Sequence, residues 1–261
     1  MDLITSRENP KIKQIVRLMA SKAERSATNL FVAEGARLCA DALESGVAVR
    51  EAFLTEKALK KYGQARLFAD NHTVTSYIIS DGVSEKISGT KGPQGIFAVC
   101  EKPGLARPEA HAENARYLLL AEIQDPGNMG SIIRTAEAFG LGGICASADC
   151  PEIFSPKVLR ASMGGVFRLK LWAAGDMSEE IARLKDEGVS IYAAGLEDNA
   201  GRLNNMRFDG PCAVLLGNEG AGLSESLVAA CGGVLKIPMA GTADSLGVAV
   251  SAGIFAWEMT K

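Results

Sequence analysis

Short apolar runs alternate with helical stretches from residue 117 to the end of the chain, and this alternation constrains the fold more than any other feature. Several runs are continuously apolar, which is typical of parallel strands that helices cover on both faces. The strand candidates are YLLLAEI, GGICAS, VFRLKLW, VSIYAAG, CAVLLG and GVLKIP. Helices are predicted between them at about 128–139, 155–163, 176–187 and 224–230, and a last helix is predicted after them at about 244–259. Residues 114–261 are therefore predicted to form an α/β domain with a parallel sheet.

A smaller α/β domain is predicted over residues 1–107. Its strand candidates are VREAFL, VTSYII and GIFAVC, which alternate with helical stretches such as TEKALKKYG. A basic amphipathic helix is predicted at about 10–26, and a second helix is predicted to open at FVAEGARLCADAL. The polar segment KPGLARPEAHAE, residues 102–113, contains two prolines and is predicted to link the two domains.

The net charge of −3 hides an asymmetry between the two predicted domains. Residues 1–107 carry 16 Lys and Arg against 12 Asp and Glu, a net of +4, whereas residues 108–261 carry 12 against 19, a net of −7. The positive charge of the first part is compatible with a domain that meets an anion.

Neither a membrane segment nor a metal site is expected from the sequence. No apolar run approaches the roughly 20 residues of a membrane helix, and the N-terminal MDLITSRENPKIKQ has no apolar signal core, so a cytoplasmic protein is predicted. The six cysteines form no C-x-x-C pair and are expected to be buried thiols in a reducing compartment. The two histidines, His72 and His111, lie in no motif and are expected at the surface, which argues against zinc and against histidine-based catalysis.

The stretch DPGNMGSIIRTAEAFG, residues 125–140, follows the first of these apolar runs and predicts a tight turn and a helix. Asn128 suits the N-cap of this helix, and Gly140 suits its end. Arg134 lies off the apolar face, close behind the carboxyl end of a strand. Open α/β sheets bind their ligands at that edge, so Arg134 is a candidate ligand contact.

Two further loops follow predicted strands, LLGNEGAGLSE at 215–225 and IPMAGTADSLGVAVSAGIFAWE at 237–258. Parallel strands bring their carboxyl ends to one edge of the sheet, where glycines let a backbone approach a ligand closely. Together the three loops predict a small-molecule site with Arg134 and Glu219 as opposite charges, although each loop alone is explained as well by glycines that turn the chain. Neither the G-K-[ST] ending of a phosphate-binding loop nor a G-x-G-x-x-G after a strand is present, so an ATPase and a dinucleotide dehydrogenase are not supported.

These motifs resemble those of the SpoU/TrmH family in the SPOUT superfamily, whose members are S-adenosylmethionine-dependent RNA ribose 2′-O-methyltransferases. The resemblance is carried by N-x-G-x-x-x-R at Asn128, Gly130 and Arg134, by L-G-N-E-G at 216–220 and by I-P-M…S-L at 237–246. The N-terminal half resembles the substrate-binding domain of that family in ITSRENPKIK, FVAEGARLCADAL and KGPQGIFAVCEKP. The likeness covers nearly the whole chain.

The resemblance implies features that the strand pattern does not show. It implies a deep trefoil knot formed by the C-terminal part of the catalytic domain, although knots are rare among protein folds. It also implies a homodimer, with S-adenosylmethionine held in the knot and the RNA site near the subunit boundary. Ribosomal RNA is favoured over transfer RNA as the substrate, because the small N-terminal α/β domain fits family members that act on ribosomal RNA.

Functional residues follow from the resemblance, position by position. The catalytic residues around the acceptor ribose would be Asn128, Arg134, Glu219 and Ser245. The cofactor would be held around Gly217, Asn218, Ile237, Met239 and Leu246. RNA contacts would come from Lys11, Lys13, Arg17 and Arg160, with Arg7, Lys22 and Arg25 as further basic side chains of the N-terminal domain. No metal ion is implied.

The family's mechanism places Arg134 at the 2′-hydroxyl. A guanidinium titrates above about 12 and is a poor base, so Arg134 is expected to bind the neighbouring phosphate and orient the ribose. Whether it also removes the proton is left open. Its structural alternative is a surface ion pair with Glu137 on the same helix.

A purely structural role is also open for the remaining candidates. Glu219 could serve as a charge or cap at a helix N-terminus, and Ser245 could cap the last helix. Arg160, in the segment VLRASMGGVFRL that also resembles the family, could lie at a solvated helix end. The basic side chains of the N-terminal domain could simply form the solvent-exposed face of an amphipathic helix, without contacting RNA.

One position departs from the family pattern. The third motif usually reads S-L-N, whereas Ser245 and Leu246 are followed here by Gly247, which has no side-chain amide. This departure supports a second hypothesis, an RNA-binding relative that has lost activity, beside the leading hypothesis of a ribosomal RNA 2′-O-methyltransferase. A transfer RNA 2′-O-methyltransferase is a third hypothesis. A generic nucleotide-binding α/β protein is a fourth, and it would lack RNA affinity.

Overall fold

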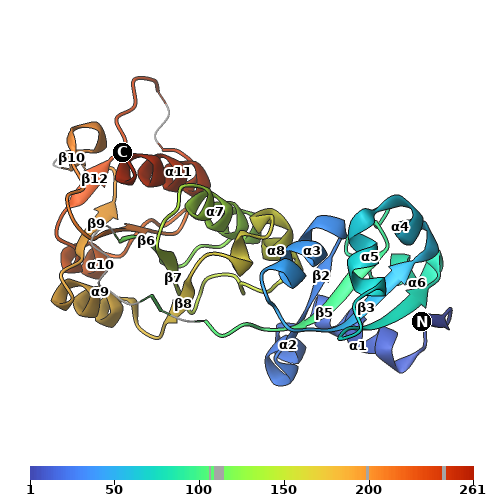
Figure 1. The fold of residues 1–261 in the computed structure, drawn as a ribbon. Coiled ribbons are helices and arrows are strands. Elements are labelled where there is room, and N and C mark those ends of the chain that lie inside the picture. Colours follow the sequence, from blue (N-terminus) through green and yellow to red (C-terminus); the bar gives the residue numbers. More distant parts are fainter. Residues whose placement is uncertain (106, 109–114, 198–199, 243–244) are drawn as a thin grey trace. The chain divides into compact units, whose positions relative to one another are not determined.

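The computed structural model describes residues 1–105, 107–108, 115–197, 200–242 and 245–261 (Figure 1). The chain forms two compact units. The first contains Met1–Gly104 together with Glu152–Phe167, and the second contains Leu105–Pro151 together with Arg168–Lys261. Most of the second half of the predicted linker, and His111 with it, lies outside the described residues. His72 is exposed, as expected.

The first unit is built on a five-stranded mixed sheet with the order β1-β4-β3-β5-β2. Its strands are β1 (Asp2–Ile4), β2 (Leu30–Glu34), β3 (Val49–Thr55), β4 (Thr75–Ile79) and β5 (Ile96–Glu101). β5 runs antiparallel to both of its neighbours, whereas β1, β4 and β3 are parallel. The three strands predicted in this half are confirmed as β3, β4 and β5.

Seven helices belong to the described part of the first unit. They are α1 (Pro10–Ala20), α2 (Lys22–Thr28), α3 (Ala36–Glu44), α4 (Glu56–Lys61), α5 (Gly63–Ala69), α6 (Asp81–Ile87) and α8 (Pro156–Ser162). The prediction of a single helix at 10–26 is wrong, because Ser21 leaves the helical conformation (φ −120°, ψ 119°). The Ser21 side chain caps α2 by accepting a hydrogen bond from the amide of Glu24. The helix predicted to open at Phe31 begins only at Ala36, because the buried run before it forms β2.

The second unit contains a seven-stranded sheet in which every strand pair is parallel, as predicted. The order is β10-β12-β9-β11-β6-β7-β8. The strands are β6 (Arg116–Leu120), β7 (Gly143–Ser147), β8 (Leu171–Ala174), β9 (Ser190–Ala194), β10 (Gly201–Arg202), β11 (Cys212–Leu216) and β12 (Val234–Lys236). All five residues of β11 are buried, which explains its unbroken apolar sequence. The predicted strand VFRLKLW is shorter than expected, since a 3₁₀ turn (Gly165–Phe167) precedes β8.

In the described part of the second unit, four helices cover this sheet: α7 (Pro126–Ala138), α9 (Met177–Asp186), α10 (Glu225–Ala230) and α11 (Val248–Met259). α7 and α11 pack on one another and on one face of the sheet, while α9 and α10 pack together on the other (Figure 1). This arrangement buries both faces of the central strands and confirms the predicted α/β fold.

The expectation of buried thiols holds for most of the cysteines. All six cysteines are free thiols and five are buried, and burial raises the pKa of Cys145 to about 12. Within the described residues, no helix combines the length and apolar character needed to cross a membrane. In that same part of the chain, no three His, Cys, Asp or Glu side chains are grouped so as to hold a metal ion.

Candidate active site

The three sequence motifs follow the carboxyl ends of β6, β11 and β12. β6 and β11 are neighbours in register, with Leu120 opposite Leu216, so their loops begin at the same level of the sheet. β9 lies between β11 and β12 and runs parallel to both. Because all these strands are parallel, their following loops meet at one edge, where this kind of sheet binds ligands.

The first motif forms the start of α7. Asp125 is the N-cap, and its carboxylate accepts from the amides of Gly127 (2.7 Å) and Asn128 (3.0 Å). The predicted N-cap at Asn128 is therefore wrong, because Pro126 suits the first helical position and places the cap at the residue before it. Gly140 has φ +69° just after the C-cap, so its predicted role at the end of the helix is confirmed.

A side-chain hydrogen bond joins the first motif to the second. Asn128 Nδ2 donates to Glu219 Oε1 (2.9 Å), and the backbone amide of Gln124 donates to Glu219 Oε2 (3.2 Å). Burial raises the pKa of Glu219, but the bonds from Asn128 and from backbone amides outweigh it, and the net effect is a lowered pKa. Glu219 is therefore ionised at neutral pH. It is not a helix cap, since α10 begins later, after Ser224.

Asn218 shapes the loop that follows β11. Its Oδ1 accepts from the amides of Gly220 (2.8 Å) and Ala221 (2.9 Å), while its Nδ2 donates to the carbonyl of Glu122 (3.1 Å). Its backbone exchanges two hydrogen bonds with Gly222, which has φ +73°. The side chain of Asn218 is thus engaged within the loop, so its contribution to a ligand would come from the backbone that it holds in place.

The loops enclose a cavity of about 610 Å³. All five predicted cofactor residues line it, namely Gly217, Asn218, Ile237, Met239 and Leu246. Two of the predicted catalytic residues, Glu219 and Ser245, line it as well. Sequence reasoning missed the wall formed by 194–197 at the end of β9; the only signal for it was the position of this segment directly after the predicted strand VSIYAAG.

Arg134 is exposed on α7 and is not among the residues that line this cavity. Its predicted alternative partner, Glu137, accepts a hydrogen bond from Arg168 instead (2.8 Å). Among the described residues, no hydrogen bond or ion pair engages the Arg134 guanidinium. Its donors are therefore available to a ligand.

The third motif leads into α11. The N-cap of α11 is Gly247 (φ −58°, ψ 143°), which caps through its backbone, so the interpretation of Ser245 as the cap is wrong. The Gly247 carbonyl accepts from the amide of Ser251 (3.0 Å). A Cβ at Gly247 would meet nothing within 4 Å, so the backbone here leaves room for the Cβ of the asparagine that is usual in this motif.

Each of the four side chains predicted to contact RNA has an acidic partner. Lys11 pairs with Glu51, Lys13 with Glu8 (2.7 Å), Arg17 with Glu24 (3.2 Å) and Arg160 with Glu34 (3.5 Å). The side chains of Lys13 and Arg17 are more than half exposed, whereas that of Arg25 is buried against Glu152. Arg25 is therefore a structural residue, and both the predicted RNA contact and the alternative of a solvent-exposed helix face are wrong for it.

Sequence comparisons agree with this geometry. The profile of the SpoU rRNA Methylase family matches residues 115–257, and that of the MRM3-like substrate binding domain matches residues 9–98. The chain is 32% identical over 260 residues, 99% of each chain, to the 23S rRNA (guanosine(2553)-2′-O)-methyltransferase RlmP of Bacillus subtilis. It is 29% identical over 265 residues to the 23S rRNA (uridine(2479)-2′-O)-methyltransferase of Streptomyces viridochromogenes, covering 99% of this chain and 91% of that one.

Solved structures show the same fold along the whole chain. The AdoMet-bound rRNA methyltransferase from Sinorhizobium meliloti superposes with a TM-score of 0.85 at 30% identity, covering 99% of this chain and 97% of the other. The resemblance inferred from the three motifs is thereby confirmed. With both its domains matched and its fold shared from end to end, the chain belongs to the SpoU rRNA methylase family.

Proposed function

We propose that this protein transfers a methyl group from S-adenosylmethionine to a ribose 2′-hydroxyl of ribosomal RNA. The observation that carries the proposal is the cavity at the carboxyl ends of the parallel strands, which the five predicted cofactor residues line together with Glu219 and Ser245. Relatives that cover almost the whole chain are named as 23S rRNA 2′-O-methyltransferases, which supports ribosomal over transfer RNA.

The cavity fits the cofactor in size and in chemistry. Its volume of about 610 Å³ lies within the range of roughly 300–1,000 Å³ that small-molecule sites occupy. Ile237, Met239 and Leu246 supply apolar surface, while the glycine-rich loop at 217–222 supplies backbone donors and acceptors that a purine or a ribose can use. Bound S-adenosylmethionine supplies the methyl group as an electrophilic sulfonium.

The acceptor ribose would be held by Asn128, Arg134, Glu219 and Ser245. Glu219 fixes the amide of Asn128 by a hydrogen bond, so the two side chains act as one rigid polar group. Arg134 would bind the phosphate beside the ribose, since a guanidinium forms bidentate bonds with phosphate. Much of the rate gain in such a transfer comes from holding the oxygen in line with the methyl group.

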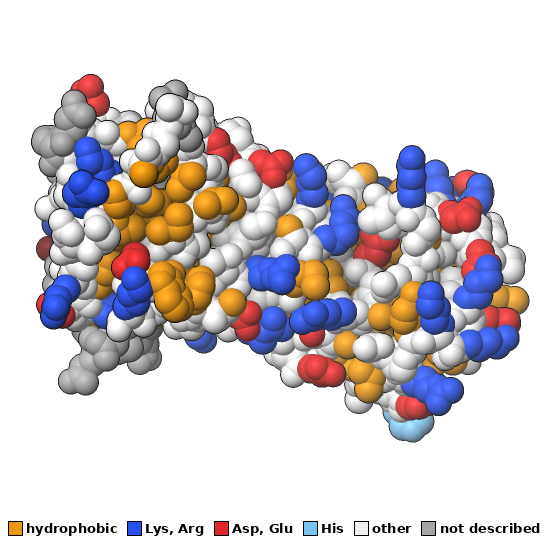
Figure 2. All heavy atoms as spheres, turned by 90° about the horizontal axis from the view of Figure 1, so that it is seen from above, with side chains coloured by type: hydrophobic (Ala, Val, Ile, Leu, Met, Phe, Trp, Pro, Cys, Tyr) orange, Lys and Arg blue, Asp and Glu red, His pale blue; other side chains and the backbone are white. Residues whose placement is uncertain are grey.

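The proposal includes an assembly in which a second copy of the chain covers α11. This helix is apolar nearly all round, and Val250 and Trp257 are 56% and 52% exposed on it. The ring of Trp257 packs against Phe139, next to the end of α7, at 5.8 Å. Figure 2 shows hydrophobic side chains gathered on the second unit. A helix that is hydrophobic all round is normally buried, which supports a homodimer through this face.

The organisation of the chain completes the proposal. Residues 1–107 would bind RNA, and residues 114–261 would form the catalytic domain. Within the latter range, the segment Glu152–Phe167 packs in the same compact unit as the N-terminal residues. We include a trefoil knot in its C-terminal part, supported by family membership and by the joint lining of one cavity by the loops after β11 and β12. A cytoplasmic location would match a ribosomal RNA substrate.

The proposal is tested first by calorimetric titration with S-adenosylmethionine and S-adenosylhomocysteine. Methylation is then measured on 23S rRNA transcribed in vitro, and the modified ribose is mapped by primer extension at low nucleotide concentration. We expect micromolar affinity and one methylated ribose.

The outcomes separate the competing hypotheses. If the protein binds the cofactor but methylates only transfer RNA, the assignment of ribosomal RNA as its substrate is wrong. RNA binding without cofactor binding would favour the inactive relative, for which Gly247 is the supporting observation.

A further inference from the structure

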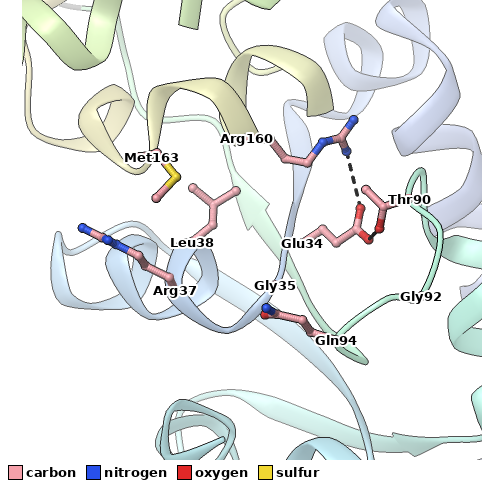
Figure 3. A pocket seen from close by; sticks show the side chains of 9 residues that line it. All are labelled: Glu34, Gly35, Arg37, Leu38, Thr90, Gly92, Gln94, Arg160 and Met163. Atoms are coloured by element: carbon pink, nitrogen blue, oxygen red, sulfur yellow. Dashed lines mark hydrogen bonds and ion pairs between the residues drawn. The ribbon is translucent and has the colours of Figure 1, made fainter. Parts of the chain in front are cut away.

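A second cavity, of about 430 Å³, lies wholly within the first unit (Figure 3). Three segments that have no role in the methyl-transfer site line it. They are the segment around Glu34 and Arg37 at the start of α3, the loop KGPQG before β5, and the segment around Arg160 in α8. The fold thus brings three stretches that are far apart in the sequence to the wall of one cavity.

A buried carboxylate holds one cation on the wall of this cavity. The Glu34 side chain is only 6% exposed; its Oε1 accepts from the hydroxyls of Ser88 and Thr90, and its Oε2 accepts from Arg160 Nη1 at 3.5 Å. The Arg160 side chain nevertheless keeps 34% of its surface exposed. Among the described residues, Glu34 engages only Nη1 of this guanidinium, which leaves Nε and Nη2 as donors for a ligand.

Arg37 provides a second cation on the same cavity. Its side chain is 71% exposed, and its ion pair with Asp41 is long, at 3.9 Å. Two arginines against the single carboxylate of Glu34 give the lining a net positive charge. Guanidinium groups in this setting favour phosphate, which they bind in a bidentate manner.

The remaining lining is suited to a flat heterocycle. Gln94 Oε1 accepts from the amide of Ala36 at 2.7 Å, which leaves the Nε2 group of Gln94 as a donor for a ligand. Leu38 and Met163 add apolar surface to the same cavity, and Figure 3 shows both pointing into the space between the two arginines. The thioether of a methionine adapts its shape to a partner, so it can pack on the face of a base.

We propose that this cavity binds one unpaired nucleotide of the RNA substrate, with the phosphates on its two sides held by Arg37 and by Arg160 and its base against Leu38 and Met163. The inference rests on the proposed function, because it takes RNA as the substrate. Proteins recognise RNA sequence chiefly through unpaired bases that are splayed out of the helix, and the cavity offers donors, charge and apolar surface in that combination. The site would fix which RNA is bound, separately from the ribose that is methylated.

Two variants of the intact protein test this site. Arg37→Ala removes an exposed phosphate contact, and Gln94→Glu keeps the acceptor for the Ala36 amide while it replaces the free donor by a negative charge. For each, the dissociation constant of unmodified 23S rRNA is measured over a range of salt concentrations, together with kcat and KM for methylation. Arg66→Ala is the matched control, since Arg66 is an exposed arginine of the same unit that does not line the cavity.

We expect Arg37→Ala to weaken RNA binding about fivefold or more and to reduce the slope of log K against log salt by about 0.7, the value for one single-strand phosphate contact. Gln94→Glu should weaken binding at least as much. Both variants should raise KM for RNA, leave kcat near the wild-type value and keep the wild-type affinity for S-adenosylmethionine. Arg66→Ala should behave as wild type.

Wild-type RNA affinity and salt slope in both variants, in a protein that methylates 23S rRNA, would overturn the nucleotide site and leave the proposed function intact. If the wild-type protein binds S-adenosylmethionine but neither binds nor methylates 23S rRNA, the proposed function itself fails. Cross-linking of 4-thiouridine-containing 23S rRNA gives a direct check. Adducts on the peptide with Leu38 or Met163 support the site, and adducts confined to other peptides of the protein contradict it.

Discussion

The hydrogen bond between Asn128 and Glu219 is central to the candidate active site. It joins residues that are 91 positions apart in the chain, at 2.9 Å, and it exists because Asp125 rather than Asn128 caps α7. The amide of Asn128 is thereby released to hold the Glu219 carboxylate, whose pKa is lowered in part by this bond. Arg134 lies further along the same helix and is exposed.

Substitution Arg134→Ala tests the positioning role of this guanidinium. Methylation should fall by about a hundredfold or more, because loss of substrate positioning by about 1 Å can cost that much. The affinity for S-adenosylmethionine, measured by calorimetry, should stay nearly unchanged, since Arg134 does not line the cavity proposed for the cofactor. Arg207→Ala, at an exposed arginine of the same unit, is the control. Unchanged methylation by the Arg134 variant would refute the assigned role.

A pair of glycine substitutions tests the cofactor cavity. A Cβ at Gly217 would approach the backbone of Gly222 to 2.7 Å, whereas a Cβ at Gly220 would meet only the Asn218 side chain, at 3.6 Å. Gly217→Ala must therefore distort the loop, and its affinity for S-adenosylmethionine should drop by about tenfold or more, equivalent to about 1.4 kcal/mol of overpacking. Gly220→Ala should bind S-adenosylmethionine more tightly than Gly217→Ala, because its Cβ would meet no backbone atom within 4 Å. Equal affinities in the two variants would place the cofactor elsewhere.

Among the structural elements, the segment Glu152–Phe167 is unusual because it packs into the first unit although it follows β7 of the second. Glu152 accepts from Arg25 at 2.6 Å and from Lys102 at 2.8 Å, and all three side chains are largely buried. The ring of Phe31 on β2 lies 5.1 Å from that of Phe154, which adds an apolar contact to the ionic one. Together these contacts attach α8, and Arg160 with it, to the first unit.

Substitution Glu152→Gln tests this attachment. It leaves Arg25 buried without its charge partner, so the free energy of unfolding should fall by about 3 kcal/mol at pH 7, as measured by urea denaturation. Burial raises the pKa of Glu152, but Arg25 and Lys102 outweigh this and bring its pKa below the ordinary value of 4.5.

The pH dependence of this effect follows from the lowered pKa. A carboxylate with a lowered pKa in the folded state stabilises the protein above its unfolded pKa, and this contribution is lost as the pH falls through the folded pKa. The difference in the free energy of unfolding between wild type and Glu152→Gln should therefore be largest at pH 7 and should decrease below pH 4.5. Glu8→Gln removes an exposed partner of Lys13 and should change stability and its pH dependence far less than Glu152→Gln, because an exposed ion pair contributes little. A constant difference from pH 7 to pH 3 would contradict the ionic role of Glu152.

For the assembly, the double substitution Val250→Glu, Trp257→Glu tests the proposed interface. Two carboxylates on the exposed face of α11 would have to be buried against the second copy, so the variant should sediment as a monomer where the wild type sediments as a dimer. Leu67→Glu, at an exposed leucine of the first unit, should leave the dimer intact. A wild-type protein that is monomeric at micromolar concentration would refute the homodimer.

Local pattern was enough to predict the parallel sheet and the meeting of its loops at one edge, whereas the five residues expected to hold the cofactor were predicted from the family resemblance. Strands such as β11 are buried on both faces, so their sequences are continuously apolar and can be recognised without knowledge of their neighbours. The glycine-rich loop at 217–222 and the segment from Ile237 follow such strands directly. Since parallel strands all end at one edge, the meeting of these loops in one cavity could be inferred from the order of strands and loops alone.

Tertiary structure alone decided which side chains meet. The pairs Asn128–Glu219 and Arg25–Glu152 join residues 91 and 127 positions apart, and no local periodicity specifies them. The first depends on β6 lying next to β11 in the sheet, and the second on a chain that returns to the first unit after β7. Hydrophobic periodicity indicates which residues are buried, but it does not indicate which residues they contact. The partners of polar and charged side chains are therefore known only from the assembled tertiary structure.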